Sequence, residues 1–228
     1  MYPLFFDPTY ILLIPALIFA IWAQFKVKST FNKFSQISTR RNVTGKQIAE
    51  YILSQFGVYD VNVEPIRGEL TDHYDPKEKV VRLSEPVYNS TSIAAIGVAA
   101  HECGHAIQHK VGYVPIKLRN AIVPVVNFTS WMAFPLFFIG FFFRGKMLMD
   151  LGILFFLGVV IFHAITLPVE LNASWRALKI LQTSQYLIGD EIKGAKKVLT
   201  AAAMTYIAAT AMAIMQLVRL LILRDSRD

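Results

Sequence analysis

Residues 134–160 read FPLFFIGFFFRGKMLMDLGILFFLGVV, and this stretch decides the class of fold. Two strongly apolar runs flank a short turn at residues 144–150. Followed outward, the runs extend over residues 120–143 and 151–169, and neither contains Asp, Glu, Lys or Arg. Because a membrane-spanning helix needs about 20 mostly apolar residues, the two runs are predicted to form a transmembrane hairpin.

Two further stretches are long and apolar enough to span a bilayer. Residues 8–25 are uncharged, and no basic residue precedes them and no small-x-small cleavage site follows, so a retained anchor is favoured over a cleaved signal peptide. Residues 198–218 are richer in alanine, and they fit either a fourth span or a buried or interfacial helix. The composition agrees, since 17% of residues are charged, against about 25% in soluble proteins.

The placement of Lys and Arg predicts the orientation in the membrane. Basic residues are most frequent in cytoplasmic loops, and here they gather just after the first span and again within residues 170–197. We therefore expect residues 26–119 and 170–197 to face the cytoplasm, with both chain ends outside. Arg219, Arg224 and Arg227 near the C-terminus argue mildly against this orientation.

The same composition excludes several classes of protein. The net charge of +7 does not indicate nucleic-acid binding, because the sequence has neither an RNA-binding glycine/aromatic pattern nor a basic helix outside apolar surroundings. The single cysteine, Cys103, excludes an internal disulfide and a zinc site made of several cysteines. No pattern in the sequence specifies an oligomeric state.

Residues 26–119 are predicted to form a mixed α/β domain. A capping box at Thr44 and Gln47 begins a helix that ends at Gly57. Alternating residues 58–63 predict a strand, and residues 70–75 and 80–83 flank a turn typical of a hairpin. The polar residues 89–92 then cap a long helix over about 93–110.

This long helix contains the stretch His101-Glu102-Cys103-Gly104-His105. Two histidines four residues apart lie on one helix face, so both imidazoles can bind one ion. Glu102 stands beside the ion, where its carboxylate can accept a proton from a zinc-bound water. The spacing therefore predicts a zinc hydrolase with one Zn²⁺, and the alternative is a surface histidine pair.

A catalytic zinc usually has three protein ligands, and the sequence leaves the third open. The elongated motif with a third histidine is broken, since Gln108 and Val111 occupy its glycine and histidine positions. Glu170, predicted to open a helix just after the third span, is favoured, and an interfacial helix-start glutamate is the alternative. His163 is the rival ligand because a polar residue inside a span suggests a function.

Several other polar residues have two interpretations each. Cys103 lies off the histidine face and is favoured as a buried structural thiol over a redox switch, and His109 as a surface or supporting group. Residues 72–75 form either a substrate-lining edge strand or ordinary hairpin surface. His73, Tyr74 and Arg176 are the candidates for stabilising an oxyanion.

With these motifs in view, the chain resembles the YugP-like family of neutral zinc metallopeptidases of bacterial membranes. It is more distantly similar to HtpX-like peptidases, which pair H-E-x-x-H with a later E-x-x-A-D. The resemblance implies that His101, His105 and Glu170 bind the metal and that Glu102 is the catalytic base. Ala173 matches the small position of the second motif. Ser174 departs from its aspartate, so a hydroxyl, or Asn172, would take the place of that carboxylate.

The sequence thus predicts a mainly α integral membrane protein with about four transmembrane helices and a cytoplasmic α+β zincin-like domain. The expected activity is hydrolysis of peptides or membrane proteins near the bilayer of a bacterial cell. The alternatives are a catalytically idle zinc-binding scaffold and a small transporter component. The expected parts are an anchor (1–25), a metallopeptidase domain (26–119), a transmembrane hairpin (120–169), a cytoplasmic helix with the third ligand (170–197), and a fourth span with a tail (198–228).

Overall fold

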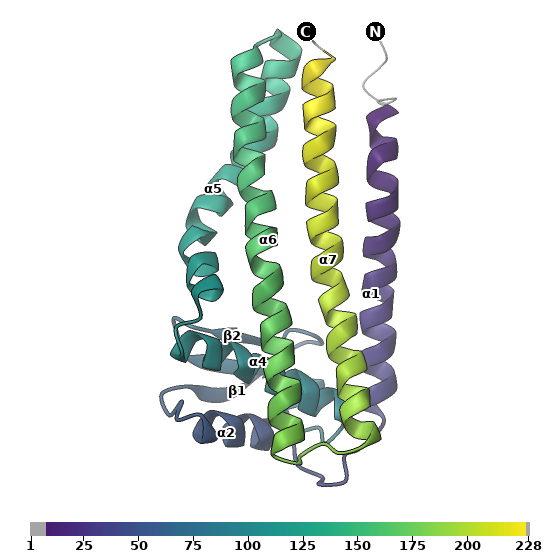
Figure 1. The fold of residues 1–228 in the computed structure, drawn as a ribbon, viewed down its shortest axis with the longest axis vertical. Coiled ribbons are helices and arrows are strands. Elements are labelled where there is room, and N and C mark those ends of the chain that lie inside the picture. The colour runs from purple at the N-terminus through teal and green to yellow at the C-terminus, as the bar shows by residue number, and fades with distance from the viewer. Residues whose placement is uncertain (1–7, 227–228) are drawn as a thin grey trace. The chain divides into compact units, whose positions relative to one another are not determined.

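The computed structural model describes residues 8–226 (Figure 1). The first seven residues of the predicted anchor and residues 227–228, including Arg227, lie outside this range. The described chain is mostly helical with a small sheet. Its elements are η1 (Pro8–Leu13), α1 (Ile14–Ser35), α2 (Gly45–Gln55), β1 (Asn62–Ile66), β2 (His73–Asp75), β3 (Val80–Ser84), α3 (Glu85–Tyr88), α4 (Ile93–Lys110), α5 (Val114–Phe143), α6 (Lys146–Thr183) and α7 (Asp190–Asp225).

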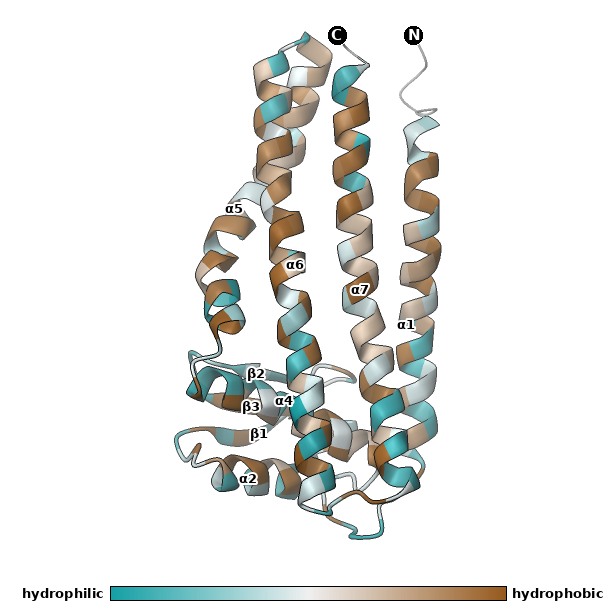
Figure 2. Ribbon diagram, viewed as in Figure 1, coloured by the Kyte–Doolittle hydropathy of each residue, from teal (hydrophilic) through white to brown (hydrophobic). Residues whose placement is uncertain are grey.

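Four helical segments of the described chain are long and apolar enough to cross a membrane: Pro8–Ser35, α5, α6 and α7. Each contains one of the four stretches predicted from the sequence. The apolar residues dominate α5 and the first part of α6, whereas polar residues become frequent towards the end of α6 (Figure 2). Each helix therefore continues beyond its apolar stretch into a more polar segment.

The prediction that a helix begins at Glu170 is wrong, because α6 runs unbroken from Lys146 to Thr183 with Pro168 inside it. Proline removes one backbone hydrogen bond from a helix interior. The residues that follow pack one helix face into the core, with Val169, Ala173 and Ala177 all fully buried. This burial favours continuing the helix, so Glu170 lies in a helix interior and not at a helix start.

The chain forms two compact units, each containing segments that are distant in sequence. The first consists of residues 8–23, 118–167 and 205–226 of the described chain. In it α5 and α6 pack closely, because a Cβ on Gly152 would lie 2.7 Å from the Ala133 carbonyl oxygen. Phe137 and Leu220 are fully buried in its core. This unit contains the predicted hairpin.

The second unit consists of residues 24–117 and 168–204. Its sheet has the order β1-β3-β2, with β1 parallel and β2 antiparallel to β3. The predicted hairpin is confirmed by β2 and β3, in which His73 pairs with Arg82. The strand predicted at 58–63 is present but starts later, since β1 begins at Asn62. The amide of Val58 instead donates to Leu53, which closes the end of α2.

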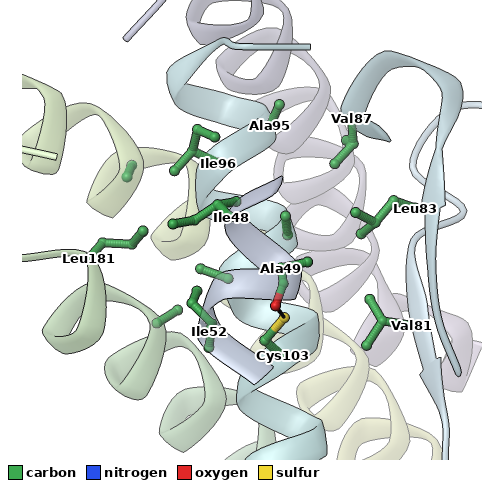
Figure 3. Close-up of a cluster of buried hydrophobic side chains, with 14 of the residues drawn as sticks. Ile48, Ala49, Ile52, Val81, Leu83, Val87, Ala95, Ile96, Cys103 and Leu181 are labelled. Atoms are coloured by element: carbon green, nitrogen blue, oxygen red, sulfur yellow. Dashed lines mark hydrogen bonds between the residues drawn. The ribbon is translucent and has the colours of Figure 1, made fainter. Parts of the chain in front are cut away.

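A single hydrophobic core joins the sheet and helices of the second unit (Figure 3). Ile48 and Ile52 of α2 lie against α4, and Leu83 of β3 and Leu181 of α6 enter the same cluster. The predicted capping box of Thr44 is present, and Ser92 caps α4, which spans the predicted residues. The core therefore holds α4 rigidly between the sheet and α6.

Candidate metal centre

The two histidines of α4 project from a helix that is buried along most of its length. At Gly104 the backbone of α4 closely approaches α6, because a Cβ there would lie 2.9 Å from the Ala173 carbonyl oxygen. Ala173 is itself fully buried. The two small residues thus allow a helix contact that only glycine permits on the α4 side, and this contact places Glu170 opposite the histidines.

His101, His105 and Glu170 come together in one group, with their ligand atoms all within 4.8 Å of one another. Oε2 of Glu170 lies 3.3 Å from Nε2 of His101 and 3.4 Å from Nε2 of His105. Atoms bound at about 2.0–2.1 Å to one tetrahedral zinc are about 3.3–3.4 Å apart. The donor types and their spacing therefore fit a zinc ion with three protein ligands.

The outer nitrogen of each imidazole has a partner of its own. Ser174 Oγ lies 3.1 Å from Nδ1 of His101, which confirms that a hydroxyl stands where the related motif has a carboxylate. Gln108 Oε1 lies 3.0 Å from Nδ1 of His105. Such partners orient a metal-binding imidazole and direct its other nitrogen towards the ion.

Glu102 lies on the same helix, nearly buried at 8% exposure. The pKa of its carboxyl is raised to about 7, mainly by burial and also by the nearby carboxylates of Glu170 and Asp72, whereas His101 and the backbone of Tyr74 oppose the shift. A carboxyl that titrates near neutrality can both accept and return a proton. The contribution of Tyr74 also shows that β2 reaches this carboxylate.

The predicted polar cluster, residues 72–75, lies on and just before β2, an edge strand of the sheet that contacts α4. The Tyr74 hydroxyl lies 3.1 Å from Nδ1 of His109, which is exposed in the last turn of α4. His73 Nδ1 lies 2.8 Å from the carbonyl oxygen of Thr71. Asp72 accepts hydrogen bonds from the amide and hydroxyl of Ser84, which fasten the start of β2 to the end of β3.

Two further candidates, Arg176 for stabilising the oxyanion and His163 for binding the metal, have different surroundings. Arg176 donates from Nε to Asn172 Oδ1 at 2.7 Å, and it lines a cavity of about 430 Å³ with residues of α2 and α6. His163 is not among the residues of the described chain that form the metal group. The predicted thiol of Cys103 is fully buried and donates to the Ala49 carbonyl at 3.6 Å (Figure 3).

Gln108 is a residue of the centre that the sequence analysis missed. It appeared there only as the residue that breaks the elongated motif, although it follows His105 by three and therefore shares its helix face. The structure buries it completely and places it against His105. The available signal in the sequence was an amide side chain one helical turn after a metal-ligand candidate.

Two imidazoles and a carboxylate that can share one ion, with a buried glutamate beside the histidines on α4, fit the site of a zinc metallopeptidase. The family model described as "putative neutral zinc metallopeptidase" matches residues 9–225, and the chain belongs to this family. The chain is similar to "Putative membrane protease YugP" of Bacillus subtilis, with 50% identity over 219 residues that cover 95% of this chain and 97% of the relative. No solved structure matches the chain.

Proposed function

We propose that this protein is a membrane-embedded zinc endopeptidase. His101, His105 and Glu170 hold one Zn²⁺, and Glu102 is the general base. The observation that carries the proposal is the convergence of three ligand atoms within 4.8 Å, beside a buried glutamate on the same helix. The family of the chain supports the same reading, because its members are described as zinc metallopeptidases.

Each residue has a distinct part in the proposed reaction. A bound zinc ion would supply a Lewis acid that activates water and polarises the scissile carbonyl. Glu102 in its ionised form accepts the proton of the attacking water and later returns it to the leaving amine. The apolar surroundings that raise its pKa also keep bulk water from competing for that proton.

We further propose that the substrate binds as an extended segment along β2. Within the described sheet β2 pairs only with β3, so its other edge is available for strand addition. The backbone of Tyr74 is near enough to lower the pKa of the Glu102 carboxyl, so a peptide on this edge would pass close to the metal group. His73 and Tyr74 are the proposed substrate-lining residues.

The proposed location is the cytoplasmic face of a bacterial cell membrane. Residues 24–117 and 168–204 form one unit, and both segments are rich in Lys and Arg. The positive-inside rule places such segments in the cytoplasm. Substrates would then be peptides or membrane proteins with a segment exposed at that surface.

The test separates metal binding from catalysis. Glu102→Gln in the full-length protein should keep its zinc, measured by metal analysis of purified protein, and lose about 10²–10⁴-fold in cleavage of a peptide library, since a positioned base contributes about this factor. Glu50→Gln, a change at an exposed glutamate of α2, is the matched control and should cleave like the wild type.

Three results would change the conclusion. If purified wild-type protein contains no zinc, the proposed metal site is wrong. Zinc without any peptide cleavage by the wild type would favour a catalytically idle scaffold. If Glu102→Gln still cleaves the peptides, the general base must be another residue.

A further inference from the structure

A chain of buried and half-buried polar side chains runs from His105 to a cavity lined by Arg176 and other residues of α2 and α6. Gln108 Nε2 donates to Asn172 Oδ1 at 3.0 Å, and Arg176 Nε donates to the same oxygen at 2.7 Å. Gln108 Nε2 also donates to the Val169 carbonyl at 2.8 Å. The series Arg176–Asn172–Gln108–His105 therefore connects α6 to the metal helix without a break.

Two groups with a fixed hydrogen-bonding role, the Arg176 guanidinium and the Val169 carbonyl, determine the direction of every bond in this series. A guanidinium can only donate and a backbone carbonyl can only accept. The oxygen of the Asn172 amide must therefore face Arg176, and the nitrogen of the Gln108 amide must face Val169 and Asn172. This leaves Gln108 Oε1, an acceptor, for His105.

It follows that His105 must donate from Nδ1, so in its neutral form it presents an unprotonated Nε2. That nitrogen is the one 3.4 Å from Glu170 Oε2. A metal ligand needs this tautomer, with the lone pair on the nitrogen that binds the ion. The orientation of a single amide thus decides whether His105 is prepared for the metal.

We propose that Gln108, Asn172 and Arg176 are positioning residues that fix His105 as its Nδ1–H tautomer before any metal binds. This inference deepens the proposed function, because it rests on His105 being a zinc ligand. Gln108 contributes the acceptor, Asn172 orients Gln108, and Arg176 orients Asn172. Because Arg176 lines the cavity, the outer end of the series is the accessible one.

The first measurement is the affinity of the full-length protein for Zn²⁺ in detergent, by competition with a chromophoric chelator. Gln108→Met keeps the size of the side chain without its amide, and it should weaken zinc binding about 10–100-fold. Gln55→Met, the same change at an exposed glutamine of α2, should leave the affinity unchanged. Equal affinity of wild type and Gln108→Met would overturn the proposal.

If Gln108→Met does not fold, two variants of Arg176 test the same proposal. Arg176 is only half-buried, so Arg176→Met and Arg176→Lys change the outer end of the series without opening the core. Arg176→Met should weaken zinc binding by up to about tenfold, and Arg176→Lys, which still donates, should restore most of the loss. Arg176→Met with wild-type affinity would contradict the role of Arg176.

The third measurement reads the tautomer itself, by ¹⁵N NMR of histidine in the metal-free protein. Wild-type His105 should be protonated at Nδ1, and Gln108→Met should show a mixture of tautomers. Protonation of wild-type His105 at Nε2 would overturn the proposal. A wild-type protein with the Nδ1–H tautomer that does not bind zinc would instead contradict the proposed function and leave the tautomer assignment standing.

Discussion

At the scale of single residues, the geometry of the metal centre depends on which nitrogen of each histidine already has a hydrogen-bond partner. Ser174 and Gln108 occupy Nδ1 of the two histidines, which leaves both Nε2 atoms directed at Glu170. Glu170 is 4% exposed, and removing a carboxylate from water carries a cost in free energy that nearby positive charge offsets. A bound divalent cation would compensate that cost.

This arrangement predicts a sharp difference between Glu170 and His163. Glu170→Ala should reduce the zinc content of purified full-length protein well below one ion per chain, because it removes one of three ligands. His163→Ala, a change on the same helix, should leave the zinc content at the wild-type level. Metal analysis after dialysis decides between them, and the reverse pattern would transfer the ligand role to His163.

At the scale of elements, the centre depends on how closely α4 and α6 approach. Gly104 and Ala173 allow the contact, and α6 continues through Pro168 so that Glu170, Ala173 and Ser174 share one rigid helix. Residues four apart on a helix lie on the same face, so Glu170 and Ser174 reach the two histidines together. One helix thus supplies both a ligand and a hydroxyl that orients another ligand.

Alanine substitutions at two glycines of α4 test this contact: Gly104 lies at the contact with α6, and Gly97 serves as the control. Gly104→Ala would place a Cβ 2.9 Å from the Ala173 carbonyl, so we expect destabilisation by about 1–3 kcal/mol and weaker zinc binding. Gly97→Ala would place a Cβ 3.5 Å from the Cβ of Ala195, an ordinary contact, and alanine favours a helix by about 1 kcal/mol. Thermal unfolding and zinc titration of both variants provide the comparison. Equal tolerance of the two changes would refute the close approach.

At the scale of the whole molecule, the chain builds two units from alternating segments. Residues 24–117 and 168–204 form the unit with the metal centre, and the hairpin of α5 and the first part of α6 belongs to the other. The positive-inside rule predicts an orientation of these units in the membrane. Residues 26–119 would lie in the cytoplasm, and the turn between α5 and α6 would lie outside.

Cysteine labelling of spheroplasts with a membrane-impermeant maleimide tests this orientation. Met147→Cys, at an 82% exposed position beside the hairpin turn, should react from outside. Lys77→Cys, in the exposed turn between β2 and β3, should react only after permeabilisation. The wild type is the control and should not react, because Cys103 is buried and burial raises the pKa of its thiol far above its usual range. Labelling of Lys77→Cys in intact spheroplasts would reverse the orientation.

The predictions from sequence succeeded where a pattern within one segment is compatible with only one local structure. The capping box at Thr44, the helix over residues 93–110 and the four apolar helices each follow from spacing or length within one segment. They failed at the start of the strand, which begins at Asn62 and not at residue 58, and at Glu170, where packing against distant residues keeps the helix continuous. Val58 closes the end of α2, and the helix around Glu170 continues because its following residues are buried.

By itself the sequence determined the membrane character of the protein and the helix with His101 and His105, because these depend on composition and helical periodicity. It also favoured Glu170 as the third ligand, from the position of this residue just after the third span. Only the tertiary structure decided that Glu170 Oε2 lies within 3.4 Å of both imidazoles, and that Gln108 and Ser174 hold the outer nitrogens. These contacts join residues more than sixty positions apart or depend on the orientation of one amide. Side-chain burial and the close packing of α4 on α6 determine both.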